Sequence, residues 1–217
     1  MAVENPVTLL SKIRRRLWRL SMKGLSRGTF ITRYAMYEHL ARVGTSLPNR
    51  SGNVLAISHS SELCGVLGIQ PNEIVEANYP EHDMTSLQFP DESFDFVMSD
   101  QVLAFIEGNP QQAIDESRRV LRQGGIAIHT TICVHPIWLT PHYNDYWRFT
   151  PEALRLLCRQ FSEVIDCGGW GNFEAWFLIR DGMRYEGIPH ATWHPLHRLA
   201  TRNDPIWPIV TWIVARK

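Results

Sequence analysis

Residues 83–131 read DMTSLQFPDESFDFVMSDQVLAFIEGNPQQAIDESRRVLRQGGIAIHTT and contain two candidate strands with a helix between them. Phe94–Met98 has four apolar residues in five, the pattern of a strand that is buried on both faces. A helix is predicted to begin after Asn109, a favoured N-cap residue followed by proline, and to end at Gly124–Gly125. Ile126–Thr130 predicts the second strand. Strand, helix and strand with short connections form a βαβ unit, so the two strands should be parallel.

The same stretch resembles the class I S-adenosylmethionine (SAM)-dependent methyltransferases, in particular those with a methyltransferase type 11-like domain. The residues that match the pattern of that family at the right spacing are Asp83, Ser86-Leu87, Phe89-Pro90-Asp91, Ser93-Phe94-Asp95, Val102-Leu103, Arg119-Val120-Leu121 and Gly124-Gly125. The resemblance implies an α/β fold, with a Rossmann-like sheet, helices on both faces and a final antiparallel strand between strands 5 and 6. We expect that last strand at Ile209–Ala215. The resemblance also implies SAM as the cofactor.

Composition and charge narrow the class of protein. The 217 residues suit one α/β domain with additions, and 44% hydrophobic with 20% charged residues is ordinary for a globular protein. The formal net charge is zero, which argues against nucleic acid as a partner. Four cysteines lie scattered without a CxxC spacing, which favours a reducing compartment, and we expect a cytoplasmic location. The apolar run Ile206–Val214 is too short to span a bilayer.

Residues 1–48 are predicted to form an N-terminal helical extension, and residues 49–217 the methyltransferase domain. A stripe of apolar residues at helical spacing opens the extension: Leu9, Ile13, Leu17 and Leu20. Cations crowd the other faces of this helix: Lys12, Arg14, Arg15, Arg16, Arg19 and Lys23. Two interpretations follow. The helix could lie on an anionic membrane surface as a peripheral contact, or it could be a solvated helix that packs through its leucines.

The loop after the candidate strand Val54–Ile57 departs from the family pattern. There the family carries three glycines, because the backbone approaches the methionine part of SAM closely. Ser58, Ser60 and Glu62 stand at those positions, with His59 between the first two. The resemblance implies that Ser58, His59 and Ser60 bind the cofactor, since serine is small and can donate to a carboxylate. The alternative is a protein that kept the fold, lost SAM and serves as a scaffold.

Other cofactor contacts follow from the resemblance. Either Glu76 or Asn78, near the end of the candidate strand 73–77, would bind the ribose hydroxyls. Asp83 and Met84 match the family positions beside the adenine, although Asp83 could equally cap the turn before Leu87. Three consecutive residues follow the strand Phe94–Met98 and would lie along the methionine of SAM: Ser99, Asp100 and Gln101. The helix that usually separates strands 2 and 3 of the family is predicted to be missing.

Residues for the acceptor side come from the end of the next strand and the loop 132–149. His129 lies at the strand end where ligands of open α/β sheets bind. The segment 144–152, NDYWRFTPE, resembles a signature of one branch of the family. In the loop 132–149, Arg148 could bind an anionic group, and His142 or Asp145 could take a proton, with Tyr146 beside them. The structural alternative is that Trp147 and Phe149 pack the loop while Arg148 pairs with Asp145.

The sequence therefore predicts methyl transfer from SAM to a small-molecule, glycan or lipid-linked acceptor. The reagent is already activated, so the protein mostly aligns its partners and excludes water. A nucleotide-dependent oxidoreductase is disfavoured because the chain lacks a GxGxxG turn. No metal site is expected, because no cysteine or acid completes a set with the three clustered histidines His190, His194 and His197.

Overall fold

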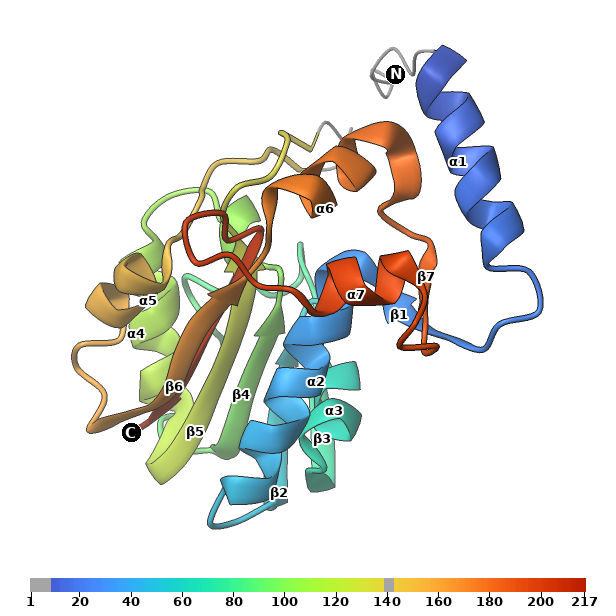
Figure 1. Cartoon of the computed structure of the whole chain (residues 1–217). Coiled ribbons are helices and arrows are strands. Elements are labelled where there is room, and N and C mark those ends of the chain that lie inside the picture. The colour runs from blue at the N-terminus through green and yellow to red at the C-terminus, as the bar shows by residue number, and fades with distance from the viewer. Residues whose placement is uncertain (1–8, 139–142) are drawn as a thin grey trace.

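The computed structural model describes residues 9–138 and 143–217, which form a central sheet with helices around it (Figure 1). In chain order the elements are α1 Leu9–Ser21, β1 Arg27–Phe30, α2 Ile31–Ser46, β2 Ser51–Ile57, α3 Glu62–Leu67, β3 Gln70–Ala77, β4 Phe94–Asp100, η1 Leu103–Phe105, α4 Pro110–Val120, β5 Leu121–Ile132, α5 Pro151–Leu157, β6 Glu163–Trp170, α6 Phe173–Leu178, η2 Ile179–Met183, β7 Gly187–Pro189, α7 Pro195–Thr201 and β8 Val210–Arg216.

Six strands form one sheet in the order β3-β2-β4-β5-β8-β6. The first four strands are parallel, as the βαβ pattern predicts, with Val97 opposite Ala127. The last strand, β8, is antiparallel to both of its neighbours and lies between β5 and β6. Both features confirm the fold that the resemblance implies. A small separate sheet joins β1 to β7.

The sheet buries both of its faces, because successive strand residues point to opposite sides. On one face Val54 and Phe96 pack with apolar side chains of α2 and α3, and on the other Leu55 and Val97 pack with those of α4 and α5. Figure 1 shows the same layers, with α4 and α5 to the left of the sheet and α2 and α3 to its right. The apolar runs of β2 and β4 in the sequence therefore reflect burial on both faces.

The predicted end of the central helix is wrong. Asn109 caps α4 as expected, because its side chain accepts from Gln111 N. The helix ends at Val120, however, and β5 begins at Leu121, five residues before the predicted strand. Gly124 has φ +75° inside β5, where the pairing with β4 shifts register. The left-handed conformation of Gly124 lies at the point where the strand is irregular. A left-handed glycine is common both at such irregularities and at helix ends, so the sequence did not distinguish the two.

The connection from β3 to β4 contains no helix or strand over residues 78–93, all of which the structure describes. The prediction that the usual helix is missing is confirmed. This short route brings Asp83 and Met84 close to the end of the sheet. Asp83 Oδ1 accepts from Thr85 N and from Thr85 Oγ1, both at 2.8 Å, so the carboxylate does cap a turn.

Helix α1 is present, but its predicted packing through leucines is wrong. Its apolar stripe faces away from the body, with Leu9 74% and Leu17 60% exposed. The opposite face docks: Ser11 is buried and Trp18 is half-buried against the core. No helix among the described residues is long and apolar enough to cross a membrane. The division into an extension, 1–48, and a domain, 49–217, stays a prediction.

Candidate functional site

A cavity of about 650 Å³ lies at the carboxyl ends of β2 and β4, the end of an open α/β sheet where ligands bind. Of the residues predicted from the sequence, it is lined by Ser58, His59, Asp83, Met84, Asp100, Gln101 and Tyr146. The rest of the wall consists of Phe30, Arg33, Ile57, Tyr79, His82, Val102, Phe105, Ile106, Glu107, Trp138, Tyr143, Asn144, Arg184 and Tyr185.

The loop after β2 keeps a left-handed backbone without glycine. Ser58 has φ 51° and His59 has φ 60°, a region that costs roughly 1–2 kcal/mol for residues with a Cβ. Non-glycine residues held in this region cluster at functional sites. Ser60 is buried outside the cavity, and its hydroxyl donates to Ile57 O and accepts from Asp100 N at 2.7 Å. The loop is therefore held by Ser60 and presents Ser58 and His59 to the cavity.

Neither candidate for ribose binding reaches the cavity. Glu76 lies exposed on β3, the edge strand of the sheet. Asn78 follows β3, and its Oδ1 accepts from His59 N at 3.0 Å, so its amide supports the loop. The structure thus brings Asp83 and the buried Met84 to the cavity, and places Glu76 and Asn78 outside it.

Asp100, at the end of β4, is surrounded by donors. Oδ2 accepts from Arg33 Nε at 2.9 Å and from the Tyr37 hydroxyl at 2.7 Å, and Oδ1 accepts from Thr130 Oγ1. Burial alone would lower the pKa of Arg33, but Asp100 raises it above the ordinary value, so the guanidinium stays charged. Burial raises the pKa of Tyr37 and Asp100 raises it further, which keeps the phenol protonated. Arg33 and Asp100 thus form a charged pair in the cavity wall.

Gln101 follows Asp100 in a left-handed conformation, with φ 63°. Its Nε2 donates to Thr130 Oγ1 at 2.9 Å and to Thr131 O at 3.1 Å. Its Oε1 is buried and has no partner among the described residues. A buried acceptor without a partner is costly, so Gln101 is a candidate to accept a hydrogen bond from a bound molecule.

Ser99 and His129 lie inside the sheet and do not line the cavity. The Ser99 hydroxyl bonds His129 Nδ1 at 2.8 Å, and both side chains are fully buried. Burial lowers the pKa of His129 to about 4, so its ring is neutral at pH 7. Neither side chain contacts the cavity, so the structure does not support the predicted roles of Ser99 in cofactor binding and of His129 in catalysis.

The loop after β5 is braced from within. Asp145 accepts from both terminal nitrogens of Arg148 and from Trp138 N, the latter at 2.7 Å. Burial would raise the pKa of Asp145, but these hydrogen bonds hold it below its ordinary value, which makes the carboxylate a poor proton acceptor. Arg148 and Asp145 thus form the structural pair, and neither lines the cavity. Tyr146 does line it, and His142 lies outside the described residues.

Several lining residues could not be named from the sequence. Arg33 lines the cavity, and Tyr37, four residues later on the same face of α2, bonds the same Asp100 carboxylate; that spacing is the one signal in the sequence that pairs them. Arg184 and Tyr185 follow η2, far along the chain from the other walls, and no motif marks them. Among the described residues no group of three or more His, Cys, Asp or Glu side chains could hold a metal ion.

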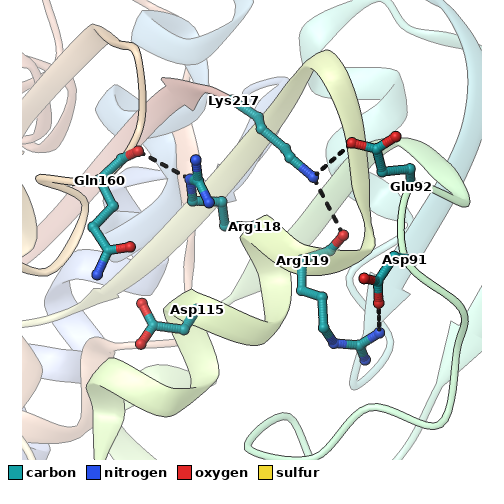
Figure 2. Close-up of a pocket in the computed structure, with 7 residues that line it drawn as sticks. All are labelled: Asp91, Glu92, Asp115, Arg118, Arg119, Gln160 and Lys217. Atoms are coloured by element: carbon teal, nitrogen blue, oxygen red, sulfur yellow. Dashed lines mark hydrogen bonds and ion pairs between the residues drawn. The ribbon is translucent and has the colours of Figure 1, made fainter.

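Figure 2 shows a second hollow, of about 420 Å³, among segments that precede β4 and β5 and follow β8. It is lined by Asp91, Glu92, Asp115, Arg118, Arg119, Gln160 and Lys217. Much of its charge is already paired: Arg119 with Asp91 at 2.7 Å, and Lys217 with Glu92 at 3.4 Å. It also lies at the opposite end of the parallel strands from the usual ligand sites. We therefore assign the candidate site to the larger cavity.

Residues 38–129 match the family model described as a methyltransferase domain. This confirms the resemblance seen in the sequence. The chain has the class I methyltransferase fold. No curated protein matches it in sequence.

Solved structures share this methyltransferase fold at low identity. A SAM-dependent methyltransferase from Mesorhizobium loti is 14% identical, with a TM-score of 0.54, over 84% of this chain and 98% of that chain. A putative SAM-dependent methyltransferase from Listeria monocytogenes is 11% identical, with a TM-score of 0.53, over 85% and 98%. Phosphoethanolamine N-methyltransferase 2 of Haemonchus contortus, determined with SAM, is 13% identical, with a TM-score of 0.51, over 82% and 51%.

The residues of the cavity fit SAM. The cofactor carries amine donors, and Gln101 Oε1 and the Asp83 carboxylate are acceptors in the wall. Met84 supplies a buried apolar surface beside Asp83. Ser58 and His59 hold a left-handed backbone, which glycine adopts readily, in the loop where the resembling family carries glycine.

Proposed function

We propose that this protein is a SAM-dependent methyltransferase that acts on a small-molecule, glycan or lipid-linked acceptor. One observation carries the proposal: the cavity at the carboxyl ends of β2 and β4 collects Ser58, Asp83 and Gln101. Its volume of about 650 Å³ falls in the range of small-molecule sites. Tyr79 and Phe105 stand in its wall and leave it open, which supports a binding site over a filled, inactive fold.

The chemistry divides between cofactor and chain. When bound, SAM supplies a methyl group already activated on a sulfonium. The chain would contribute orientation: Gln101 and Asp83 accept hydrogen bonds from the cofactor, and Met84 packs its ring. The aromatic side chains Phe105, Trp138 and Tyr185 would seat the acceptor and keep water away from it. Tyr146 is the predicted catalytic residue that stands closest to that task, since it lines the cavity.

Calorimetric titration with SAM and with S-adenosylhomocysteine tests the proposal. We expect micromolar binding that weakens by about tenfold or more in Asp83→Ala, because a hydrogen bond to a charged group contributes about 1.5–3 kcal/mol. Glu81→Ala is the matched control, because Glu81 is an exposed acid of the same connection and does not line the cavity. Its affinity should equal that of the wild type.

Absence of binding at millimolar cofactor would contradict the proposal. Binding that Asp83→Ala and Glu81→Ala weaken equally would show that the cofactor lies elsewhere. With binding established, a screen of acceptors by transfer of a labelled methyl group would identify the substrate.

A further inference from the structure

One cation in the cavity wall, Arg184, forms no ion pair within the described part of the chain. Arg33, by contrast, is paired with Asp100. Arg184 Nη1 donates to His135 Nε2 at 2.7 Å, and its Nε is buried without a partner among the described residues. The guanidinium lies over the ring of Trp138 at 4.2 Å and over that of Tyr185 at 5.5 Å.

In this arrangement the Arg184 guanidinium keeps its positive charge, and no ion-pair partner among the described residues balances it. Burial, and then the charge of Arg33, lower its pKa to about 10, so the guanidinium still carries a proton at pH 7. Burial and Arg184 lower the pKa of His135 to about 4, so the imidazole is neutral and can accept from the guanidinium. A buried cation without a counter-ion is costly, and an anion that enters the cavity would relieve that cost.

We propose that Arg184 binds an anionic group, carboxylate or phosphate, on the methyl acceptor. The inference rests on the proposed function and names the acceptor class: a molecule with a planar or apolar part and one anionic group. Arg184 offers a planar fork of donors that suits either anion. Trp138 and Tyr185, which flank it, would hold the planar part. The carboxylate of SAM has the same chemistry and is the competing source.

The test uses phenyl phosphate as the probe and neutral phenol as its comparison, titrated by NMR with and without saturating S-adenosylhomocysteine. We expect phenyl phosphate to bind more tightly than phenol, and Arg184→Gln to weaken only phenyl phosphate, by about tenfold or more. Arg184→Lys should weaken it less. Arg180→Gln is the control, because Arg180 lies outside the cavity, over the Phe177 ring.

Three results would overturn the assignment. Equal binding of phenyl phosphate and phenol would show no anion site. Loss of S-adenosylhomocysteine affinity in Arg184→Gln, in step with that of phenyl phosphate, would assign Arg184 to the cofactor. If Arg180→Gln weakened phenyl phosphate binding as much as Arg184→Gln does, the effect would come from the overall positive charge and not from a site at Arg184. The titration without S-adenosylhomocysteine measures binding at the anion site even if the protein does not bind the cofactor. The experiment can therefore contradict the anion site and the proposed function independently.

A second observation, independent of the cavity, concerns α1. Its exposed apolar side chains are Leu9, Leu10, Ile13, Leu17 and Leu20, each between 47% and 74% exposed. At 100° per residue these five positions fall within one arc of about 100°. The helix lies at the outside of the molecule in Figure 1, and the exposed fractions of these side chains show that the stripe faces solvent.

The exposure of the stripe does not come from a detached helix. Arg14 pairs with Asp181 at 2.6 Å, and Arg19 Nε donates to Glu186 at 2.6 Å. Ser11 also donates to Asp181, and the Trp18 ring lies 6.2 Å from that of His194. The helix is thus docked through its polar face, which leaves its apolar face to solvent.

We infer that α1 binds the surface of an anionic phospholipid bilayer. The helix contains no Asp or Glu. Lys12 and Arg16 border the stripe at helical spacing, and neither makes an ion pair with a described residue. An outward apolar face edged by cations matches a helix that lies in the headgroup region and contacts anionic lipids. Since Asp181 and Glu186 flank Arg184 and Tyr185, the docked helix would place the cavity near the membrane surface.

Cosedimentation of the full chain with vesicles tests this inference. We expect binding to vesicles of phosphatidylcholine and phosphatidylglycerol, little binding to phosphatidylcholine alone, and release at high salt. The double variant Leu17→Ser, Leu20→Ser and the double variant Lys12→Gln, Arg16→Gln should each reduce binding by about tenfold or more. Ile206→Ser is the control, because Ile206 is 79% exposed and lies outside α1.

Sedimentation velocity without lipid completes the design. A monomer that binds anionic vesicles agrees with the inference. A dimer that Leu17→Ser, Leu20→Ser dissociates would assign the stripe to self-association and overturn it. Equal binding to both kinds of vesicle, or to neither, would also overturn it.

Discussion

The Ser60 hydroxyl accepts a hydrogen bond from the backbone nitrogen of Asp100 at 2.7 Å and so joins the carboxyl ends of β2 and β4. The same hydroxyl donates to Ile57 O. In the sequence Ser60 looks like the loss of a family glycine. In the structure its side chain links the ends of the two strands that lead into the cavity, a contact that glycine could not make.

Replacing this hydroxyl should loosen the loop. Ser60→Ala is expected to lower the free energy of unfolding by about 1–3 kcal/mol, because it leaves buried polar groups without a partner. Urea denaturation measures the change. Ser61→Ala is the control: its side chain caps nothing, so the free energy should hardly move. Equal effects of the two substitutions would contradict the bridging role of Ser60.

Glycine in place of a left-handed residue of the same loop should stabilise the protein. Ser58→Gly is expected to raise the free energy of unfolding by about 1 kcal/mol, because φ 51° is unfavourable for a residue with a Cβ. Ser61→Gly, at φ −60°, should lower it by roughly 0.5–1 kcal/mol instead. Both values come from urea denaturation, and opposite signs are the decisive result.

Buried His129 should make stability depend on pH. Its pKa is about 4 in the folded protein against 6.5 ordinarily, so the unfolded chain binds more protons between these values. Stability should therefore fall as pH drops from about 6.5 to about 4, by about 3 kcal/mol from this residue. His129→Gln should flatten the pH dependence of the urea midpoint across that window, and an unchanged slope would refute the assignment.

The pair Asp145–Arg148 should behave as a buried ion pair. The Asp145 side chain is 0% exposed, so its attraction to Arg148 is weakly screened. A double-mutant cycle to alanine should give a coupling of about 1–3 kcal/mol in thermal unfolding. The pair Arg202–Glu174, with both side chains more than half exposed, is the control and should couple by less than about 1 kcal/mol.

Much of the fold could be predicted, because local patterns were enough for it. The buried strand β4, the capped start of α4 and the place of β8 all followed from motifs within the sequence or from the family they resemble. The end of α4 did not, because Gly124 is left-handed in a strand irregularity as it would be at a helix end. Periodicity also located the apolar face of α1, but the acids Asp181 and Glu186 that hold its other face lie far along the chain.

The candidate site divides in the same way. Ser58, Asp83 and Gln101 follow strand ends or a family motif, and they line the cavity as the sequence suggested. Their roles in binding stay predictions. Arg33 and Arg184 reach the cavity through the tertiary fold: Arg33 meets Asp100 across 67 positions of the chain. No pattern of spacing reports such a contact, because it depends on how separate helices pack against the sheet.

The position of β8 bears on how the protein is made. Among the described strands β6 pairs only with β8, yet it leaves the ribosome some forty residues earlier. Until β8 inserts between β5 and β6, these two strands expose unpaired edges and apolar surface, which favours aggregation. Completion of the sheet must therefore follow synthesis of the last strand. A chain stalled before residue 210 would need a chaperone to shield those edges, and could serve as a probe for one.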